Sequence, residues 1–365
     1  MSTLSPTLMM VNLSKSWGGG EKWFLTVGEA LQQRGFTVIW VAYPDSALHK
    51  RLEAKGFPFE ISSARFSSLL NPFKVLAIRS ILNKHRPDMI MMNASHELKT
   101  FGLMASMSGV PHVIFRRGVS YSIGVNRLNQ WYMDRIVTAF LANSHATFHA
   151  VTSSFPILLK KNHLRLNNGI QMSAWKAYPE KQVAFYIGMS ARLAEVKGID
   201  RAILAMKKVI KEIPEAQLHI LGDGPDRERL IQMSKDKGLG NNVIFHGFVK
   251  DVQSVLSPVS IFLFTPKLGE GTSIALIEAM AMKLPCVVFD TPAMAEVVVD
   301  GESGFVVKDG DIDGLAERLI ILLKDGKLRR KMGIAGRKRA EENFSLSKAV
   351  IDPLENWLLQ MVQDD

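Results

Sequence analysis

The sequence predicts an α/β protein with two doubly wound domains, each built on a parallel sheet. Three observations carry this prediction. The 365 residues suffice for two hydrophobic cores, the apolar (47%) and charged (22%) fractions are those of a globular protein, and short apolar runs alternate with longer amphipathic ones. The alternation is typical of parallel strands covered by helices on both faces. The composition excludes disordered, collagen-like and coiled-coil chains.

The first half of the chain follows this alternation from its first apolar run. The amphipathic run 21–33, which ends before Gly35, predicts the first helix. Helical stretches separate the later apolar runs. The strands predicted here are 7–13, 36–42, 89–93, 112–115 and 139–143.

The pattern breaks near Asn168-Gly169-Ile170, where a polar stretch with Pro179 follows, and then restarts. We therefore predict an N-terminal domain over 1–170, a C-terminal domain over 171–345, and a closing helical segment over 346–365 that packs back toward the first domain. Two such domains are expected to face a ligand-binding cleft. The strands predicted in the second half are 183–189, 217–221, 243–245, 261–264 and 286–289, and the last helices are 312–324, 328–343 and 346–362.

The formal net charge of +10 is uneven along the chain. Residues 1–165 hold 19 basic and 8 acidic residues (+11), whereas residues 166–365 hold 26 and 27 (−1). Such asymmetry favours an anionic partner for the first half, either a membrane surface or a nucleic acid. No apolar window reaches the length of a membrane-spanning helix and the N-terminus lacks a signal-peptide pattern, so membrane contact would be peripheral. The single cysteine, Cys286, excludes an intrachain disulfide.

A basic stretch in the first half combines Lys74, Arg79, Lys84 and Arg86 with several apolar residues. It could form a peripheral membrane helix. Because the basic residues spread around the helix, a solvated surface helix is the favoured interpretation.

Two glycine-rich turns follow predicted strands. Ser16-Trp17-Gly18-Gly19-Gly20-Glu21 opens the first helix, where the amides of Gly19 and Gly20 could hold an anion; a flexible turn is an equally good interpretation. Leu221-Gly222-Asp223-Gly224-Pro225 has Arg227 where a dinucleotide fingerprint would place its third glycine. A structural turn is therefore the default interpretation at Gly222.

A basic loop follows the first strand of the second half. Arg192 and Lys197 lie five residues apart there, with Gly198 next. Arg supplies a planar fork of donors and Lys a point charge, so the pair could hold a diphosphate. For an isolated Arg/Lys pair, a solvated basic turn is the commoner explanation.

The most informative block runs from Gly269 to Ala281. Glu270 precedes Gly271, Thr272 and Ser273, which begin a helix whose free amides would face the same space. Glu278 follows among apolar residues, where a carboxylate needs a hydroxyl or cationic partner. A partly exposed glutamate explains Glu278 alone but explains the whole constellation poorly.

This block resembles the E-x7-E motif of retaining glycosyltransferases of family 4, the glycosyl transferases group 1 type, which have the GT-B fold. Other landmarks of that family occur in the expected order over nearly the whole chain. The matches are more specific in the second half of the chain than in the first. They are the Gly18–Glu21 loop, Arg192 with Lys197-Gly198, the 221–225 turn, Phe245-His246-Gly247-Phe248, Leu284-Pro285 and Gly301-Glu302-Ser303-Gly304-Phe305.

The resemblance implies a role for each matching position. Arg192 and Lys197 would grip the diphosphate of a nucleotide-sugar donor and stabilise the leaving group, and Glu270 would orient the donor sugar. Glu278 would bind the ribose hydroxyls. The remaining donor contacts would come from amides and from the nucleobase side, namely Gly19, Gly20, Gly222, Gly271, Thr272, Ser273, His246 and Phe248.

The resemblance implies no metal and no cofactor, because Arg, Lys and helix dipoles neutralise the phosphate charge. Asp311-Ile312-Asp313 accordingly reads as a helix N-terminus. One departure stands out: many relatives carry a histidine in a first-domain loop close to the donor sugar, and here that loop reads Phe115-Arg116-Arg117-Gly118. Arg116, Arg117 and His96 are thus candidates for contacts to the sugar or acceptor, although a structural role is favoured for a lone histidine.

The expected function is transfer of a sugar to a hydroxyl of a cell-envelope saccharide or glycolipid, as in lipopolysaccharide or polysaccharide biosynthesis. A sugar-nucleotide epimerase or hydrolase on the same scaffold is the alternative, and a non-catalytic binding protein is disfavoured by the four charged residues together. Expected partners are a nucleotide sugar, a saccharide or lipid-linked acceptor and an anionic membrane, with no nucleic acid. The expected location is the cytoplasm, at the inner face of the membrane.

Overall fold

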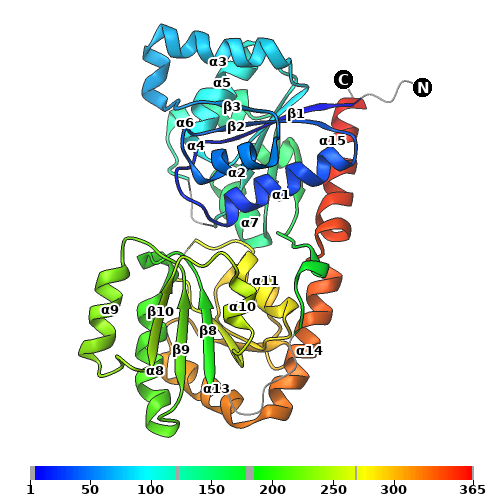
Figure 1. The fold of residues 1–365 in the computed structure, drawn as a ribbon. Helices are drawn as coiled ribbons and strands as arrows, with labels where there is room; N and C mark the ends of the chain where they lie inside the picture. The colour runs from blue at the N-terminus through cyan, green and yellow to red at the C-terminus, as the bar shows by residue number, and fades with distance from the viewer. Residues whose placement is uncertain (1–4, 121–122, 178–184, 268, 364–365) are drawn as a thin grey trace. The chain divides into compact units, whose positions relative to one another are not determined.

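The chain forms two compact units, each built on its own parallel sheet (Figure 1). The structure is a computed structural model that describes residues 5–120, 123–177, 185–267 and 269–363. The first unit holds Met1–Asn167 together with Val350–Asp365, and the second holds Asn168–Ala349. The predicted α/β class with two doubly wound sheets is confirmed.

The first unit has a seven-stranded sheet in the order β3-β2-β1-β4-β5-β6-β7, with parallel neighbours. Its central strands are continuous apolar runs, such as residues 8–11, because helices bury both faces. The strands are β1 (Thr7–Asn12), β2 (Thr37–Ala42), β3 (Phe59–Ile61), β4 (Met89–Met92), β5 (His112–Arg117), β6 (Ala139–Ala142) and β7 (Asn162–Arg165).

Helical segments connect these strands, and one of them comes from the far end of the chain. Arg34 lies 2.7 Å from both Asp352 and Glu355, which confirms the predicted packing of a C-terminal helix against the first domain. The segments are α1 (Gly19–Gln33), α2 (Ala47–Lys55), η1 (Phe66–Leu70), α3 (Pro72–His85), α4 (Ser95–Glu97), η2 (Leu98–Gly102), α5 (Leu103–Met107), α6 (Arg127–Trp131), η3 (Tyr132–Ile136), α7 (His145–Ser154), η4 (Pro156–Lys160) and α15 (Asp352–Gln363).

The second unit has a six-stranded parallel sheet in the order β10-β9-β8-β11-β12-β13. Its strands are β8 (Tyr186–Ser190), β9 (Gln217–Leu221), β10 (Val243–Gly247), β11 (Ile261–Phe264), β12 (Cys286–Phe289) and β13 (Gly304–Val307). Its helical segments are η5 (Met172–Ala174), η6 (Glu195–Lys197), α8 (Ile199–Glu212), α9 (Arg227–Asp236), α10 (Val252–Leu256), α11 (Ile274–Ala281), α12 (Pro292–Val297), α13 (Ile312–Lys324) and α14 (Gly326–Asn343), followed by η7 (Leu346–Ile351) at the junction with the first unit.

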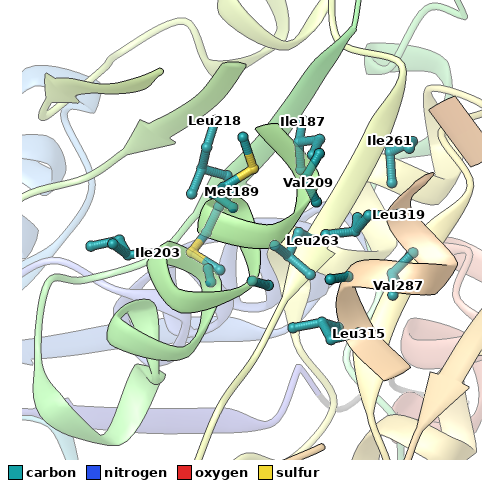
Figure 2. Close-up of a cluster of buried hydrophobic side chains, with 14 of the residues drawn as sticks. Ile187, Met189, Ile203, Val209, Leu218, Ile261, Leu263, Val287, Leu315 and Leu319 are labelled. Carbon is teal, nitrogen blue, oxygen red and sulfur yellow. The ribbon is translucent and has the colours of Figure 1, made fainter. Parts of the chain in front are cut away.

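The core of the second unit lies between its sheet and helices α8 and α13 (Figure 2). Alternate residues of the central strands, such as Ile187 and Met189 of β8, point to the same face. They meet Ile203 and Val209 of α8 and, on α13, Leu315 and Leu319. These side chains are fully or almost fully buried, so the sheet that positions the loops is rigidly packed.

Most of the predicted strands and helices are confirmed within a few residues, with the following exceptions. The edge strands β3, β7 and β13 were not predicted. β3 has only three residues, and β7 reads Asn-His-Leu-Arg, which is not an apolar run. β13 reads Gly-Phe-Val-Val and begins inside the Gly301–Phe305 segment, which resembles a turn of the family. The predicted helix 346–362 is divided into η7 and α15. The predicted strand 183–189 begins at Tyr186, and residues 183 and 184 lie outside the described part of the chain.

Helix α13 begins where the sequence predicts, since the Asp311 side chain accepts a hydrogen bond from the Gly314 amide at 2.9 Å. The Asp311-Ile312-Asp313 string is therefore a helix cap, as predicted. In the part of the chain that the structure describes, none of the helices is long and apolar enough to cross a lipid bilayer.

Strand order reverses once in each sheet, between β1 and β4 in the first unit and between β8 and β11 in the second. At such a point the connections from the two neighbouring strands leave toward opposite faces, and a crevice opens at the carboxyl ends of the strands. The glycine-rich loop follows β1, and the Arg192 loop follows β8. Topology therefore places both predicted loops where ligands bind in this class of sheet.

The reversal point of the first unit is held together by Glu97, a residue that the sequence does not single out. Its Oε1 accepts a hydrogen bond from the Leu13 amide after β1 (2.7 Å), and its Oε2 accepts from the Asn93 and Ala94 amides after β4 (2.9 and 2.8 Å). The side chain is 1% exposed. Burial raises the pKa of Glu97 to about 7, although the three amides act in the opposite direction.

We expect a Gly28→Val substitution to destabilise the protein by about 1–3 kcal/mol through overpacking. A Cβ at Gly28 on α1 would lie 2.5 Å from the rigid Trp40 ring and 2.9 Å from the Met10 sulfur. Chemical denaturation of the variant measures the loss. Gly124→Ala is the control, because nothing lies within 4 Å of a Cβ there. Equal stability of the two variants would contradict this packing.

Glu97 makes stability depend on pH. Its folded-state pKa exceeds the ordinary value of 4.5, so its contribution to stability is fully present below that pH and is lost as pH rises to about 7. The loss is on the order of 3 kcal/mol. In urea titrations Glu97→Gln should flatten this part of the pH profile, whereas Glu53→Gln, at an exposed site on α2, should leave it unchanged. An unaltered profile in Glu97→Gln would refute the assignment.

Candidate active site

The candidate site of the second unit centres on an ion pair between Lys197 and Glu270. Lys197 ends η6 in the loop after β8, and Glu270 lies in the loop after β11, so the pair joins the two loops that flank the strand reversal. Both side chains are largely buried, at 24% and 16% exposure. The structure thus brings together two predicted residues that are 73 positions apart in sequence.

The surroundings of Lys197 make its positive charge costly in the absence of a bound anion. Burial, and to a smaller extent the neighbouring positive charge of Arg192, lowers the pKa of Lys197 to about 8. Arg192 itself is exposed on the same loop. A ligand anion placed against Arg192 and Lys197 would favour the charged form of Lys197, because opposite charge offsets the cost of burial. The arrangement can therefore bind phosphate groups.

The Arg192 loop owes its path to glycines in the neighbouring turn after β9. The Leu193 amide donates to Asp223 O (2.9 Å), and the Asp226 amide donates to Leu193 O (3.0 Å). Gly222 has φ +134°, and a Cβ there would lie 1.9 Å from Ala191 O. Only glycine fits at this position. The structure thus assigns Gly222 a scaffolding role under the loop.

The start of α11 faces the same reversal point from the β11 side. Ser273 caps the helix by accepting a hydrogen bond from the Leu276 amide (3.4 Å). Thr272 and Ser273 are buried, and Thr272 O accepts a hydrogen bond from Asn168 Nδ2 (2.6 Å). Gly271 precedes them. Glu278 lies on the same helix at 4% exposure, so its carboxylate is held inside the unit.

His246 and Phe248 lie farther along the same sheet, on or just after the edge strand β10, which is two strands from β8. His246 Nε2 is 2.9 Å from His219 Nδ1 of β9, and the two rings stack. Burial lowers the pKa of both imidazoles, and the effect on His219 is reinforced by His246. Phe248 is 58% exposed, which leaves an aromatic surface open at this edge.

In the first unit the start of α1 and the end of β5 meet through Arg116. Its guanidinium donates to Asn93 Oδ1 (2.6 Å) and lies over the Trp23 ring at 3.9 Å. Burial lowers the pKa of Arg116 to about 9, and the charge of Glu21 opposes this shift. A Cβ at Gly20 would lie 3.0 Å from Asn93 Nδ2, so the glycine loop rests on the same asparagine.

This geometry corrects one prediction. Arg116 and Arg117 are not in a loop: they are the last residues of β5, and both are buried, at 1% and 7% exposure. Two consecutive arginines look like a solvated turn, but aromatic stacking on Trp23 offsets part of the desolvation cost of Arg116. Arg116 therefore packs inside the unit, against the start of α1.

His96 is half-exposed on α4, with its Nε2 3.9 Å from Glu97 Oε1. Burial, and to a smaller extent Arg65, lowers the pKa of His96, which favours the neutral imidazole. His96 therefore lies beside the Glu97 contacts. Gly19 begins α1, where free helix amides are available to an anion.

Three residues at these sites were not predicted, namely Asn93, Glu97 and Asn168. Each of them forms hydrogen bonds with backbone groups or with a buried side chain. Such contacts leave no pattern of charged residues in the sequence. The available signal was position: Asn93 directly follows a buried strand, and Glu97 comes four residues later. In the described residues no group of three His, Cys, Asp or Glu side chains could hold a metal ion.

Two protein-family models match the chain. "Glycosyl transferases group 1" matches residues 174–339, and "Glycosyltransferase Family 4" matches residues 17–164. The chain is 30% identical over 171 residues to N-acetyl-alpha-D-glucosaminyl L-malate synthase of Bacillus anthracis (47% of this chain, 44% of that protein). It is 31% identical over 225 residues to the capsular polysaccharide biosynthesis glycosyltransferase CapM of Staphylococcus aureus (61% and 57%). These matches span about half the length of each relative.

Solved structures match the fold over almost the full length of the chain. Anabaena Alr3699/HepE in complex with UDP and glucose gives a TM-score of 0.85 at 18% identity, covering 97% of this chain and 100% of that one. The lipopolysaccharide outer core galactosyltransferase WaaB gives a TM-score of 0.73 at 18% identity, covering 97% and 99%. The matching models, sheet topology and fold together show that the chain belongs to glycosyltransferase family 4, the glycosyl transferases group 1 type, with the GT-B fold.

Proposed function

We propose that this protein transfers a sugar from a nucleotide-diphosphate donor to a hydroxyl of a cell-envelope saccharide or glycolipid, with retention at the anomeric carbon. The observation that carries the proposal is the Lys197–Glu270 pair at the strand reversal, with Arg192 on the same loop and the start of α11 opposite. These groups supply what a departing diphosphate needs, namely two cations and the positive end of a helix.

In this proposal the donor exchanges partners with the protein. The diphosphate takes Lys197 and Arg192, and it frees Glu270 from its ion pair to accept hydrogen bonds from the donor sugar. Lys197 is prepared for this exchange, because its lowered pKa of about 8 reflects a desolvated amine that gains from the larger negative charge of the diphosphate. Glu278 binds the ribose, and the exposed Phe248 lies on the nucleobase side.

The chemical step breaks the bond between the anomeric carbon and the diphosphate oxygen and forms a bond from the acceptor oxygen to the same carbon. The electron pair leaves with the diphosphate, which takes the acceptor proton on the same face. Arg192 and Lys197 stabilise the developing negative charge, so no protein nucleophile and no metal ion is required.

The acceptor class rests on the relatives and on charge. CapM is named for capsular polysaccharide biosynthesis, and a Bacillus subtilis relative, 31% identical over 176 residues, is named as a poly(glycerol-phosphate) alpha-glucosyltransferase. The net +11 of residues 1–165 supports an acceptor that is anionic or carried by an anionic membrane.

Donor turnover tests this function. With UDP-, GDP- and ADP-sugars in EDTA, we expect one donor to release nucleotide diphosphate only when a saccharide or lipid-linked acceptor is added. Release without acceptor would indicate a hydrolase, and isomerised donor would indicate an epimerase; either would overturn the proposal. Complete loss of turnover in EDTA would overturn the metal-independent step alone.

Two variants separate donor binding from chemistry. Glu278→Ala should mainly raise the donor KM, because it removes contacts made in both ground and transition states. Arg192→Ala should lower kcat by about 100-fold, the usual cost of losing a stabiliser of the leaving charge. The controls are Glu317→Ala and Arg229→Ala at exposed sites of the same unit. Normal turnover in both test variants would remove the assignment.

A further inference from the structure

The first unit exposes a cluster of large apolar side chains that the proposed reaction does not use. Phe66 and Leu70 of η1 are 47% and 89% exposed, and Phe73 and Leu76 of α3 are 80% and 60% exposed. We call these four residues and the bases around them the η1–α3 surface. Single exposed apolar residues are ordinary, but four within eleven positions are not.

The outward position of these side chains follows from the way α3 packs. Asn71 caps the helix by accepting a hydrogen bond from the Phe73 amide (3.0 Å), and the inner side of the helix buries Ile78 and Leu82. At about 100° per residue, Phe73 and Leu76 project from the side opposite these two. Figure 1 shows α3 beside α5, on which it packs. The helix is therefore apolar on two faces, and among the described residues of the first unit the face with Ile78 and Leu82 is the packed one.

The charge around this outer face has one sign. Residues 61–87 contain no Asp or Glu, and they contain five basic residues: Arg65, Lys74, Arg79, Lys84 and Arg86. Lys74 and Arg79 flank the Phe73–Leu76 strip on its two sides, and both are exposed. From η2, Lys99 Nζ lies 5.7 Å from the centre of the Phe66 ring. Lys84 alone among the five has a described acidic contact, with Glu60 at 2.7 Å.

We propose that the η1–α3 surface docks on an anionic lipid bilayer, with Phe66, Leu70, Phe73 and Leu76 inserted below the headgroups. Lys and Arg side chains beside an inserted apolar strip can keep their stems in the apolar layer and their charges among the lipid phosphates. The apolar and the electrostatic contributions together meet the need for two signals in stable peripheral binding. This inference goes beyond sugar transfer and does not depend on it.

Charge decides between a bilayer and a second copy of the chain. In a two-fold contact the same basic residues would face one another, and within residues 61–87 there is no acid to pair with them. An anionic bilayer supplies both the negative charge and the apolar interior. From sequence alone, α3 is interpreted as a solvated surface helix. Its exposed apolar face now favours an anionic bilayer as its partner.

Flotation of the full chain with lipid vesicles tests the proposal. We expect the protein to bind phosphatidylglycerol-containing vesicles, to bind pure phosphatidylcholine vesicles much more weakly, and to lose affinity as ionic strength rises. A Phe73→Ser, Leu76→Ser double variant should bind at least about tenfold more weakly, because it removes two inserted side chains. Lys74→Glu with Arg79→Glu should abolish the preference for anionic lipid.

The matched control is Ile334→Ser, which removes an apolar side chain of similar size that is 53% exposed on α14, in the second unit. It should bind vesicles like the unaltered protein. Because the substituted residues of α3 are exposed, each variant should unfold at the same temperature as the unaltered protein, and this comparison separates docking from folding.

Failure to bind anionic vesicles, or equal binding by the serine double variant, would overturn the inference. Dimerisation that the same variant abolishes, without any vesicle binding, would assign the surface to a second copy instead and would also overturn it. Donor turnover with a water-soluble saccharide acceptor and no lipid is measured separately, so failure of docking is distinguishable from failure of the proposed reaction.

Discussion

The reversal of strand order is the constraint on which both units depend. It opens the carboxyl end of each sheet between two strands whose connections leave toward opposite faces, at β1 and β4 and at β8 and β11. In each unit a carboxylate then ties the two loops together. Glu97 does so through three backbone amides, and Glu270 does so through Lys197. In both units the loops are thus held together by side-chain contacts as well as by chain connectivity.

Close packing of these loops leaves no room for side chains at certain points. Gly198 has φ +62°, and a Cβ there would lie 1.9 Å from the backbone oxygen of Thr265. The side-chain hydroxyl of Thr265 donates a hydrogen bond to Gly198 O (2.9 Å). This contact joins the residue after Lys197 to the residue after β11, so the segment that carries the cation is held against the end of that strand. Desolvation follows from the same packing, and it is the main cause of the lowered pKa of Lys197.

The fold was predictable because buried parallel strands are long apolar runs in the sequence. The charged residues of the second unit were predictable because the ends of neighbouring parallel strands lie close together. Sequence reasoning missed β7 because an edge strand such as Asn162–Arg165 needs few apolar residues. It placed Arg116 in a loop because the aromatic ring that buries the guanidinium is distant in sequence. The role of Glu97 could not be predicted for a different reason. Its partners are main-chain amides, which almost every residue carries, so the sequence does not identify them.

Helix α15 has a consequence for the order in which the units are completed. The chain leaves the first unit after Asn167, forms the second, and returns at Val350. Arg34 meets Asp352 and Glu355 across more than 300 residues, and Trp357 Nε1 donates to Asn162 Oδ1 at 2.6 Å. During synthesis on the ribosome the second unit can therefore finish folding while the first unit still lacks helix α15. The unit that is synthesised first is the last to be complete.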